Sequence, residues 1–98
     1  MKRFLTSLVA LAVTATAASL AHAADKLTLQ LQWVTQAQFA GYYVALDKGY
    51  YKEEGLDVTI KPGGPDIAPP QVLAGGGADL MLNWMPSALA AREKGVPL

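Results

Sequence analysis

Segments with the pattern of β-strands alternate with segments of helical periodicity, and this alternation limits the possible folds more than any other feature of the chain. The strand-like segments are 27–33, 56–60 and 78–82, and another apolar run begins at 96. The helical segments are 38–47, 50–55, 67–74 and 87–94. A β-α-β-α-β-α-β order implies parallel strands with right-handed crossovers and helices on both faces of the sheet. We therefore predict an α/β fold with a parallel sheet.

Turn and capping residues set the expected boundaries of these elements. Gly49 stands where the end of a helix favours a left-handed residue. Asp66 is expected to cap the helix that follows it, with Pro69 and Pro70 in the first turn, where a missing N–H donor costs least. Asp79 is expected to make a hydrogen bond at the start of the third strand.

Residues 1–23 have the pattern of a secretory signal peptide. Two basic residues precede an apolar run over 4–20, and Ala21-His22-Ala23 fits the small-x-small cleavage pattern. A membrane anchor is the other interpretation, but the run is short and no charged stop-transfer cluster follows it. We expect export and cleavage after Ala23, which leaves residues 24–98.

The absence of cysteine limits the possible cellular locations, and the charge limits the possible classes of partner. The chain has no cysteine, so it lacks the residue that would carry a lipid anchor. An exported protein without that anchor needs a second membrane to hold it, and we therefore predict the periplasm. The 8 basic residues fall to 6 without Lys2 and Arg3, against 8 acidic ones. No basic stripe of the kind that nucleic-acid binding requires is present, so we expect no nucleic-acid partner.

The mature segment is short for a domain, because residues 24–98 bury only a modest core. We interpret it as part of a larger domain, since the chain stops at Leu98 as a new apolar run begins. The other interpretation is a complete small domain, which would need a partner or a second copy to cover its sheet edge.

Polar, aromatic and glycine residues gather at the junctions where predicted strands pass into helices. The carboxyl ends of parallel strands lie at one edge of a sheet, and ligands of open α/β sheets bind there. The candidate ligand-binding residues at these junctions are Trp33, Gln36, Gln38, Gly63, Gly64, Asn83, Trp84 and Ser87.

Two indole rings at equivalent junctions favour a flat, delocalised ligand. Trp33 and Trp84 would stack on such a ligand, although each also suits an ordinary core position. The Asn83 amide would pair with the edge of a heterocycle. The loop at Gly63 and Gly64 would offer backbone N–H groups to a neutral ligand, or form a plain turn. No basic side chain is expected beside the tryptophans, which disfavours an anionic ligand.

The side chains for catalysis are scarce. The only histidine is His22, within the expected leader, and cysteine is absent, so the mature segment lacks an imidazole base, a thiol nucleophile and the usual zinc ligands. Asp66 and Asp79 are more plausible in the structural roles given above. We therefore expect no catalytic residues, no metal site and no cofactor.

Four stretches carry a resemblance to a known family. They are Leu31-Gln32-Trp33 with Gln36 to Ala45, Lys48 to Val58, Pro62 to Asp66, and Ala91 to Leu98. They resemble substrate-binding proteins of ABC importers, and most closely the binders of pyrimidine precursors in thiamine salvage. The stretch from Lys48 to Val58 is shared with nitrate, sulfonate and riboflavin binders, so it indicates the fold better than the ligand.

The resemblance implies a two-lobed periplasmic binding protein of type II, with the ligand between the lobes. Residues 24–98 would form part of the N-terminal lobe. The implied partners are an ABC importer permease and a small ligand. A thiamine pyrimidine precursor is the first choice, riboflavin or another aromatic compound the second, and an alkyl sulfonate or nitrate the third.

One branch of the same fold is an enzyme that makes the thiamine pyrimidine with a pyridoxal-phosphate lysine and a histidine. An alignment on Ala78 and Asp79 puts Asn83 and Ser87 at those two places, and Phe39 where that branch has another histidine. The resemblance therefore favours a binding protein over a pyrimidine synthase.

Overall fold

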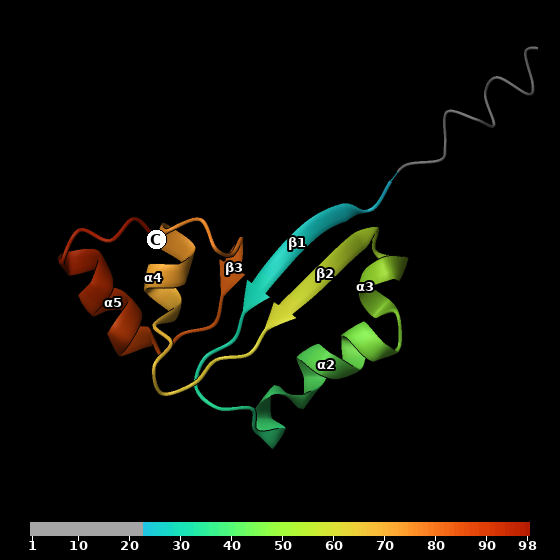
Figure 1. Cartoon of the computed structure of the whole chain (residues 1–98), viewed down its shortest axis with the longest axis horizontal. Helices are drawn as coiled ribbons and strands as arrows, with labels where there is room; N and C mark the ends of the chain where they lie inside the picture. Colours follow the sequence, from blue (N-terminus) through green and yellow to red (C-terminus); the bar gives the residue numbers. More distant parts are fainter. Residues whose placement is uncertain (1–22) are drawn as a thin grey trace, which may run out of the picture.

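The computed structural model describes residues 23–98, so the predicted signal peptide lies outside the described part. Figure 1 shows the elements in chain order. They are β1 (Asp25–Gln30), a 3-10 helix η1 (Ala37–Phe39), α2 (Ala40–Asp47), α3 (Tyr50–Glu53), β2 (Leu56–Lys61), α4 (Pro69–Ala74), β3 (Leu80–Met81) and α5 (Met85–Glu93). None of the helices in this part of the chain is long and apolar enough to cross a membrane.

The three strands form a parallel sheet in the order β2-β1-β3, which confirms the predicted α/β class. β1 pairs with β2 along its whole length, from Asp25 opposite Leu56 to Gln30 opposite Lys61. β3 pairs with β1 through two residues only, Leu80 and Met81. The central strand therefore holds the sheet together.

Strand boundaries differ from the sequence prediction in all three strands. The first strand begins at Asp25 rather than at Leu27 and ends at Gln30 rather than at Trp33, which has a left-handed backbone with φ 56°. The second strand extends one residue further, to Lys61. The third strand is shorter than 78–82, since β3 lies at the edge of the described sheet and has β1 as its only neighbour there. Residues 96–98 form no strand.

The core lies between the sheet and helices α2 and α3. Strand alternation places Leu29, Leu31 and Val58 on one face, where they are buried together with Phe39. Burial of one such side chain stabilises the fold by about 1.5–3 kcal/mol. Half-buried aromatic residues of the two helices complete this cluster, namely Tyr42, Tyr43 and Tyr51. Helices α4 and α5 lie on the other side of the sheet (Figure 1).

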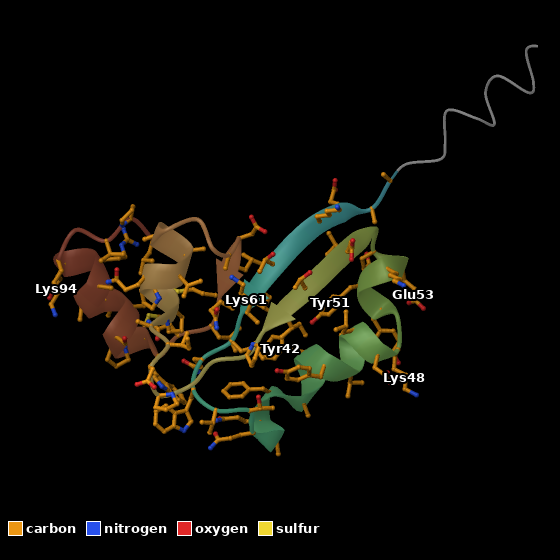
Figure 2. All side chains as sticks on the ribbon, viewed as in Figure 1. Tyr42, Lys48, Tyr51, Glu53, Lys61 and Lys94 are labelled. Atoms are coloured by element: carbon orange, nitrogen blue, oxygen red, sulfur yellow. The ribbon has the colours of Figure 1, made fainter. Side chains whose placement is uncertain are left out.

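The Tyr51 hydroxyl joins the two helices that cover the core (Figure 2). It donates a hydrogen bond to the backbone carbonyl of Tyr42, with 3.0 Å between the oxygens. Burial raises the pKa of Tyr51 above its ordinary value, and the neighbouring Tyr42 adds to this shift.

Most predicted boundary residues have the expected role, and Asp66 does not. Gly49 is left-handed with φ 76°, and the two prolines open α4. Asp66 lies in a turn closed by a hydrogen bond from Ile67 N–H to the carbonyl of Gly64, and the residue before α4 is Ala68, which makes no side-chain cap. A proline disfavours helical backbone in the residue before it, so the helix begins only at Pro69.

Asp79 anchors the start of β3, as the sequence predicted. The backbone N–H of Thr28 donates to Asp79 Oδ2 at 2.8 Å, and the Asp79 N–H donates to the Thr28 carbonyl at 2.9 Å. The last helix begins at Met85, two residues before the predicted start. The Leu82 N–H donates to the Gln30 carbonyl at 2.9 Å, so the residue that follows β3 lies beside the end of β1.

Candidate functional site

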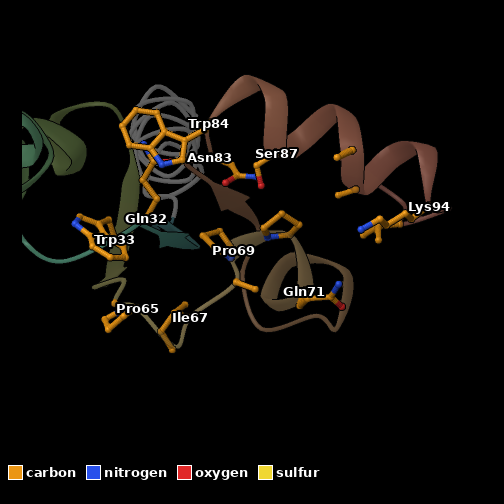
Figure 3. Close-up of a pocket in the computed structure, with 16 residues that line it drawn as sticks. Gln32, Trp33, Pro65, Ile67, Pro69, Gln71, Asn83, Trp84, Ser87 and Lys94 are labelled. Atoms are coloured by element: carbon orange, nitrogen blue, oxygen red, sulfur yellow. The ribbon is translucent and has the colours of Figure 1, made fainter.

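A cleft of about 410 Å³ opens at the carboxyl ends of β1 and β3, beside the first turn of α4 and along α5 (Figure 3). In the strand order β2-β1-β3, the central strand β1 is followed in sequence by β2, its neighbour on one edge. The chain then crosses to β3, the neighbour of β1 on the other edge. In open α/β sheets, ligands bind in the crevice where the strand order reverses in this way. The cleft therefore lies where the topology favours a ligand site.

Five of the eight predicted ligand-binding residues line this cleft and three do not. Those in the cleft are Trp33, Gly64, Asn83, Trp84 and Ser87. Those outside it are Gln36, Gln38 and Gly63. The structure thus brings the junctions after β1, β2 and β3 together, and ligand contact by their side chains stays a prediction.

Gln36 and Gln38 lie on an exposed part of the chain that turns away from the cleft. Gln38 Nε2 donates a hydrogen bond to Gln36 Oε1 at 2.6 Å, and both side chains are exposed. The sequence prediction extended the first strand to Trp33. Because β1 ends at Gln30 instead, the chain has already left the sheet edge when it reaches these glutamines.

Trp33, which lines the cleft, and Gly63, which does not, form a tight backbone contact. The left-handed backbone of Trp33 is rare for a bulky residue, and such outliers gather at functional sites. A Cβ atom on Gly63 would lie 2.6 Å from the backbone nitrogen of Trp33, so no larger residue fits there without movement. The close approach of two backbones therefore explains the glycine, rather than a ligand.

Gln32 lines the cleft but was not among the residues predicted from the sequence, and its amide can form hydrogen bonds. Its side chain is only 8% exposed, it lines the cleft, and Oε1 has no hydrogen-bond partner among the described residues. A buried acceptor without a partner costs about 1–3 kcal/mol. In the sequence, Gln32 stands out only as part of a stretch that carries the family resemblance, and not as a candidate ligand-binding residue. Gln32 Oε1 is the one enclosed side-chain N or O atom without a hydrogen-bond partner among the described residues.

Gln30, two residues earlier, shows the opposite arrangement. Its side chain is also buried, but Nε2 donates to the carbonyl oxygens of Leu31 at 2.8 Å and Pro62 at 3.1 Å. These hydrogen bonds tie the loop after β2 to the end of β1. Gln30 is therefore a structural residue, and Gln32 is not satisfied by the same backbone.

The remaining walls of the cleft are mostly apolar, and their polar side chains are Gln71, Lys94 and one amide–hydroxyl pair. Asn83 Nδ2 lies 3.3 Å from Ser87 Oγ and donates to it across one turn. The two indoles are largely exposed, Trp33 at 48% and Trp84 at 55%. The opposite wall is formed by Pro65, Ile67, Ala68, Pro69 and Pro70. A flat ligand with hydrogen-bonding groups on its edge suits these surfaces.

One charged side chain, Lys94 at the end of α5, lines the cleft. In Figure 3 Lys94 lies at the opposite end of the cleft from Trp33 and Trp84, so it does not contradict the prediction that no basic side chain lies beside the tryptophans. Periodicity predicted the helix but not that its whole length would border the cleft. Among the described residues, no group of three or more His, Cys, Asp or Glu side chains is placed to hold a metal ion.

Comparisons with known proteins agree with this picture. A family model described as NMT1/THI5 like matches residues 36–98. The formylaminopyrimidine-binding protein of Halalkalibacterium halodurans is 36% identical over 76 residues, which cover 78% of this chain and 23% of that protein. A 4-amino-5-hydroxymethyl-2-methylpyrimidine phosphate synthase of Saccharomyces cerevisiae is 36% identical over 76 residues, which cover 76% of this chain and 22% of the synthase. A Haemophilus influenzae protein whose name refers to thiamine biosynthesis is 30% identical over 77 residues, which cover 78% of this chain and 24% of that protein.

The chain spans less than a quarter of the length of these relatives. The family has the periplasmic-binding-protein fold, and the parallel sheet of residues 23–98 is consistent with it. The family match takes in β2, α4, β3 and α5, and with them most of the cleft, including Asn83 and Trp84. The chain therefore belongs to the NMT1/THI5-like family.

Proposed function

We propose that the protein is a receptor for a small, flat nitrogen heterocycle, with a pyrimidine precursor of thiamine as the first choice. The observation that carries the proposal is the pair of exposed indoles that line one cleft together with the Gln32 amide, at the reversal of the strand order. The indoles would hold the faces of the ring, and the Gln32 amide would turn its buried, unpaired oxygen toward the cleft to accept a hydrogen bond from an amino group on the ring edge. The relative named as a formylaminopyrimidine-binding protein supports this class of ligand.

The cellular role that we propose is delivery of this ligand to an ABC importer. Residues 24–98 would form part of the N-terminal lobe of a two-lobed receptor, and the second lobe would close over the cleft. Export would depend on the leader, with cleavage after Ala23, and would place the receptor in the periplasm beside its permease. The sequence of the leader and the family support this role.

A pyrimidine synthase is the second candidate, because several yeast relatives carry that name. The resemblance places the pyridoxal-phosphate lysine and a histidine of that branch at Asn83 and Ser87. In the structure these two side chains are hydrogen-bonded to each other, and neither is an amine or an imidazole. The amine that does line the cleft, Lys94, belongs to the end of α5. The residues after β3 therefore do not fit the cofactor, and binding is the better proposal.

Replacement of Gln32 tests the proposed ligand contact. We expect Gln32→Leu to weaken binding of a 4-aminopyrimidine by about 1–3 kcal/mol, because the amino group loses its acceptor. The same change should leave the free energy of unfolding equal or higher, since it removes a buried acceptor without a partner. Tryptophan fluorescence titration and urea unfolding would measure the two effects.

Gln30→Leu is the matched control for that experiment. Gln30 is also buried, but its Nε2 donates to three carbonyl oxygens, so its loss should lower the free energy of unfolding. Full affinity in Gln32→Leu, or destabilisation equal to that of Gln30→Leu, would show that Gln32 is a structural residue and not a ligand contact.

A further inference from the structure

Helix α5 forms one long side of the cleft and presents different chemistry along its length. Trp84 precedes the helix, Ser87 lies in its first turn, Ala91 lies in its middle, and Lys94 is its C-cap residue; all four line the cleft. Their spacing of three to four residues places them on one face of the helix. The cleft therefore runs from an aromatic, hydrogen-bonding end to a cationic end.

The distance between the two ends suits an extended ligand. Seven residues separate Ser87 from Lys94, which corresponds to roughly 10 Å along the helix axis. Side chains on a helix lean toward its N-terminus, so the Lys94 stem leans back along the cleft. In Figure 3 Lys94 lies at the end of the cleft opposite Trp33 and Trp84. Ala90 and Ala91 are small and leave space between the two ends.

Lys94 is the one charged side chain among the residues that line the cleft. Its neighbours there are apolar or neutral, so no carboxylate of the cleft competes for the ammonium group. Asp66 lies in the loop between β2 and α4, but its side chain does not line the cleft. An anion placed beside Lys94 would form a charge-assisted hydrogen bond, which is stronger than a bond between neutral groups.

We propose that Lys94 forms an anion subsite, so that the preferred ligand is a heterocycle with a phosphate or carboxylate group on an extended substituent. The ring lies between the indoles and Gln32, and the acidic group reaches the ammonium of Lys94. This inference rests on the proposed function, since it assumes that a heterocycle occupies the aromatic end.

The competing explanation for Lys94 is stabilisation of a helix end. A cation at the C-terminus of a helix interacts favourably with the helix dipole. Lys48 offers a matched comparison, because it is the C-cap residue of α2 and does not line the cleft. Any effect that both lysines share belongs to the helix ends, and any effect unique to Lys94 belongs to the cleft.

The test compares 4-amino-5-hydroxymethyl-2-methylpyrimidine with its phosphate ester by calorimetry on the wild-type protein, Lys94→Gln and Lys48→Gln. We expect the wild type to bind the ester about tenfold more tightly than the alcohol, the scale of one charge-assisted hydrogen bond. Lys94→Gln should abolish this difference, and Lys48→Gln should keep it. Higher salt should reduce the preference for the ester, because ions screen an exposed charge.

Two results would overturn the inference. Equal affinity of the wild type for the two compounds would show that Lys94 does not select an anion. Loss of the difference in both variants would assign the effect to helix stability. If neither compound binds the wild type, the proposed function itself fails. Inorganic phosphate alone serves as a further probe, and binding of it as tight as that of the ester would show that the ring adds nothing.

Discussion

The two tryptophans are the residues on which the proposed ligand would stack. Both indoles line the cleft and are about half exposed, which leaves their faces available. We expect Trp33→Ala and Trp84→Ala each to weaken binding by roughly 1–3 kcal/mol, the cost of one lost stacking surface. Tyr50→Ala, which removes an exposed aromatic ring outside the cleft, should leave affinity unchanged. Normal affinity in both tryptophan variants, measured by calorimetry on folded protein, would mean that the ligand lies elsewhere.

Gly63 and Gly41 provide a second residue-level prediction, on stability. A Cβ at Gly63 would overlap the backbone of Gln32 and Trp33, whereas a Cβ at Gly41 meets nothing within 4 Å. We expect Gly63→Ala to lower the free energy of unfolding by about 1–3 kcal/mol and to weaken ligand binding, because it displaces Trp33. Gly41→Ala, inside α2, should stabilise by about 0.5–1 kcal/mol. Urea unfolding would measure both, and equal effects would contradict the backbone contact.

Some cleft residues were predictable from the sequence pattern and others were not, for physical reasons. Trp84 and Asn83 were predictable, because they directly follow an apolar run and precede a helix. Gln32 was not, since period-two alternation says which face a residue occupies but not whether a loop covers that face. The position of Lys94 in the cleft was also not predictable, because the direction in which α5 runs from the sheet edge depends on contacts distant in sequence.

At the scale of elements, the short strand β3 depends on one carboxylate. β3 pairs with β1 through only two residues, and Asp79 adds the bond from the Thr28 N–H. We expect Asp79→Ala to lower the free energy of unfolding by about 1 kcal/mol and to weaken ligand binding, because Asn83 and Trp84 follow β3 directly. Asp57→Ala on β2 is the control, an exposed strand aspartate away from the cleft. Unchanged urea unfolding of Asp79→Ala would show that the backbone pairs suffice.

Element types were predictable from the sequence, and several boundaries were not. Alternation and helical spacing indicated four parallel strands and the helices between them; the structure confirms the first three strands, and residues 96–98 form none. The end of β1 depends on the left-handed backbone of Trp33, a conformation that its residue type does not favour. The start of α4 depends on the restriction that Pro69 imposes on Ala68, which outweighed the capping preference of Asp66.

At the scale of the whole molecule, the proposed second lobe would close over the cleft that residues 24–98 form. The cleft is open, and the edge strand β3 exposes 52% of Leu80. We expect residues 24–98 produced alone to bind the heterocycle weakly and to associate through this edge, because an unpaired strand favours pairing with another chain. Size-exclusion chromatography, a thermal unfolding scan and a ligand titration would test this. A monomer with a sharp transition and micromolar affinity would contradict it.

The central claim is that the cleft binds a flat nitrogen heterocycle. The most direct measurement is calorimetric titration of the protein with a 4-amino-pyrimidine precursor of thiamine, riboflavin, taurine and nitrate under one set of conditions. The two indoles and the unmet oxygen of Gln32 predict that the pyrimidine binds most tightly, and that taurine and nitrate bind weakly, since they have neither a ring to stack nor an amino group on a ring edge. Tight binding of taurine or nitrate, with no heat from the pyrimidine, would contradict the account.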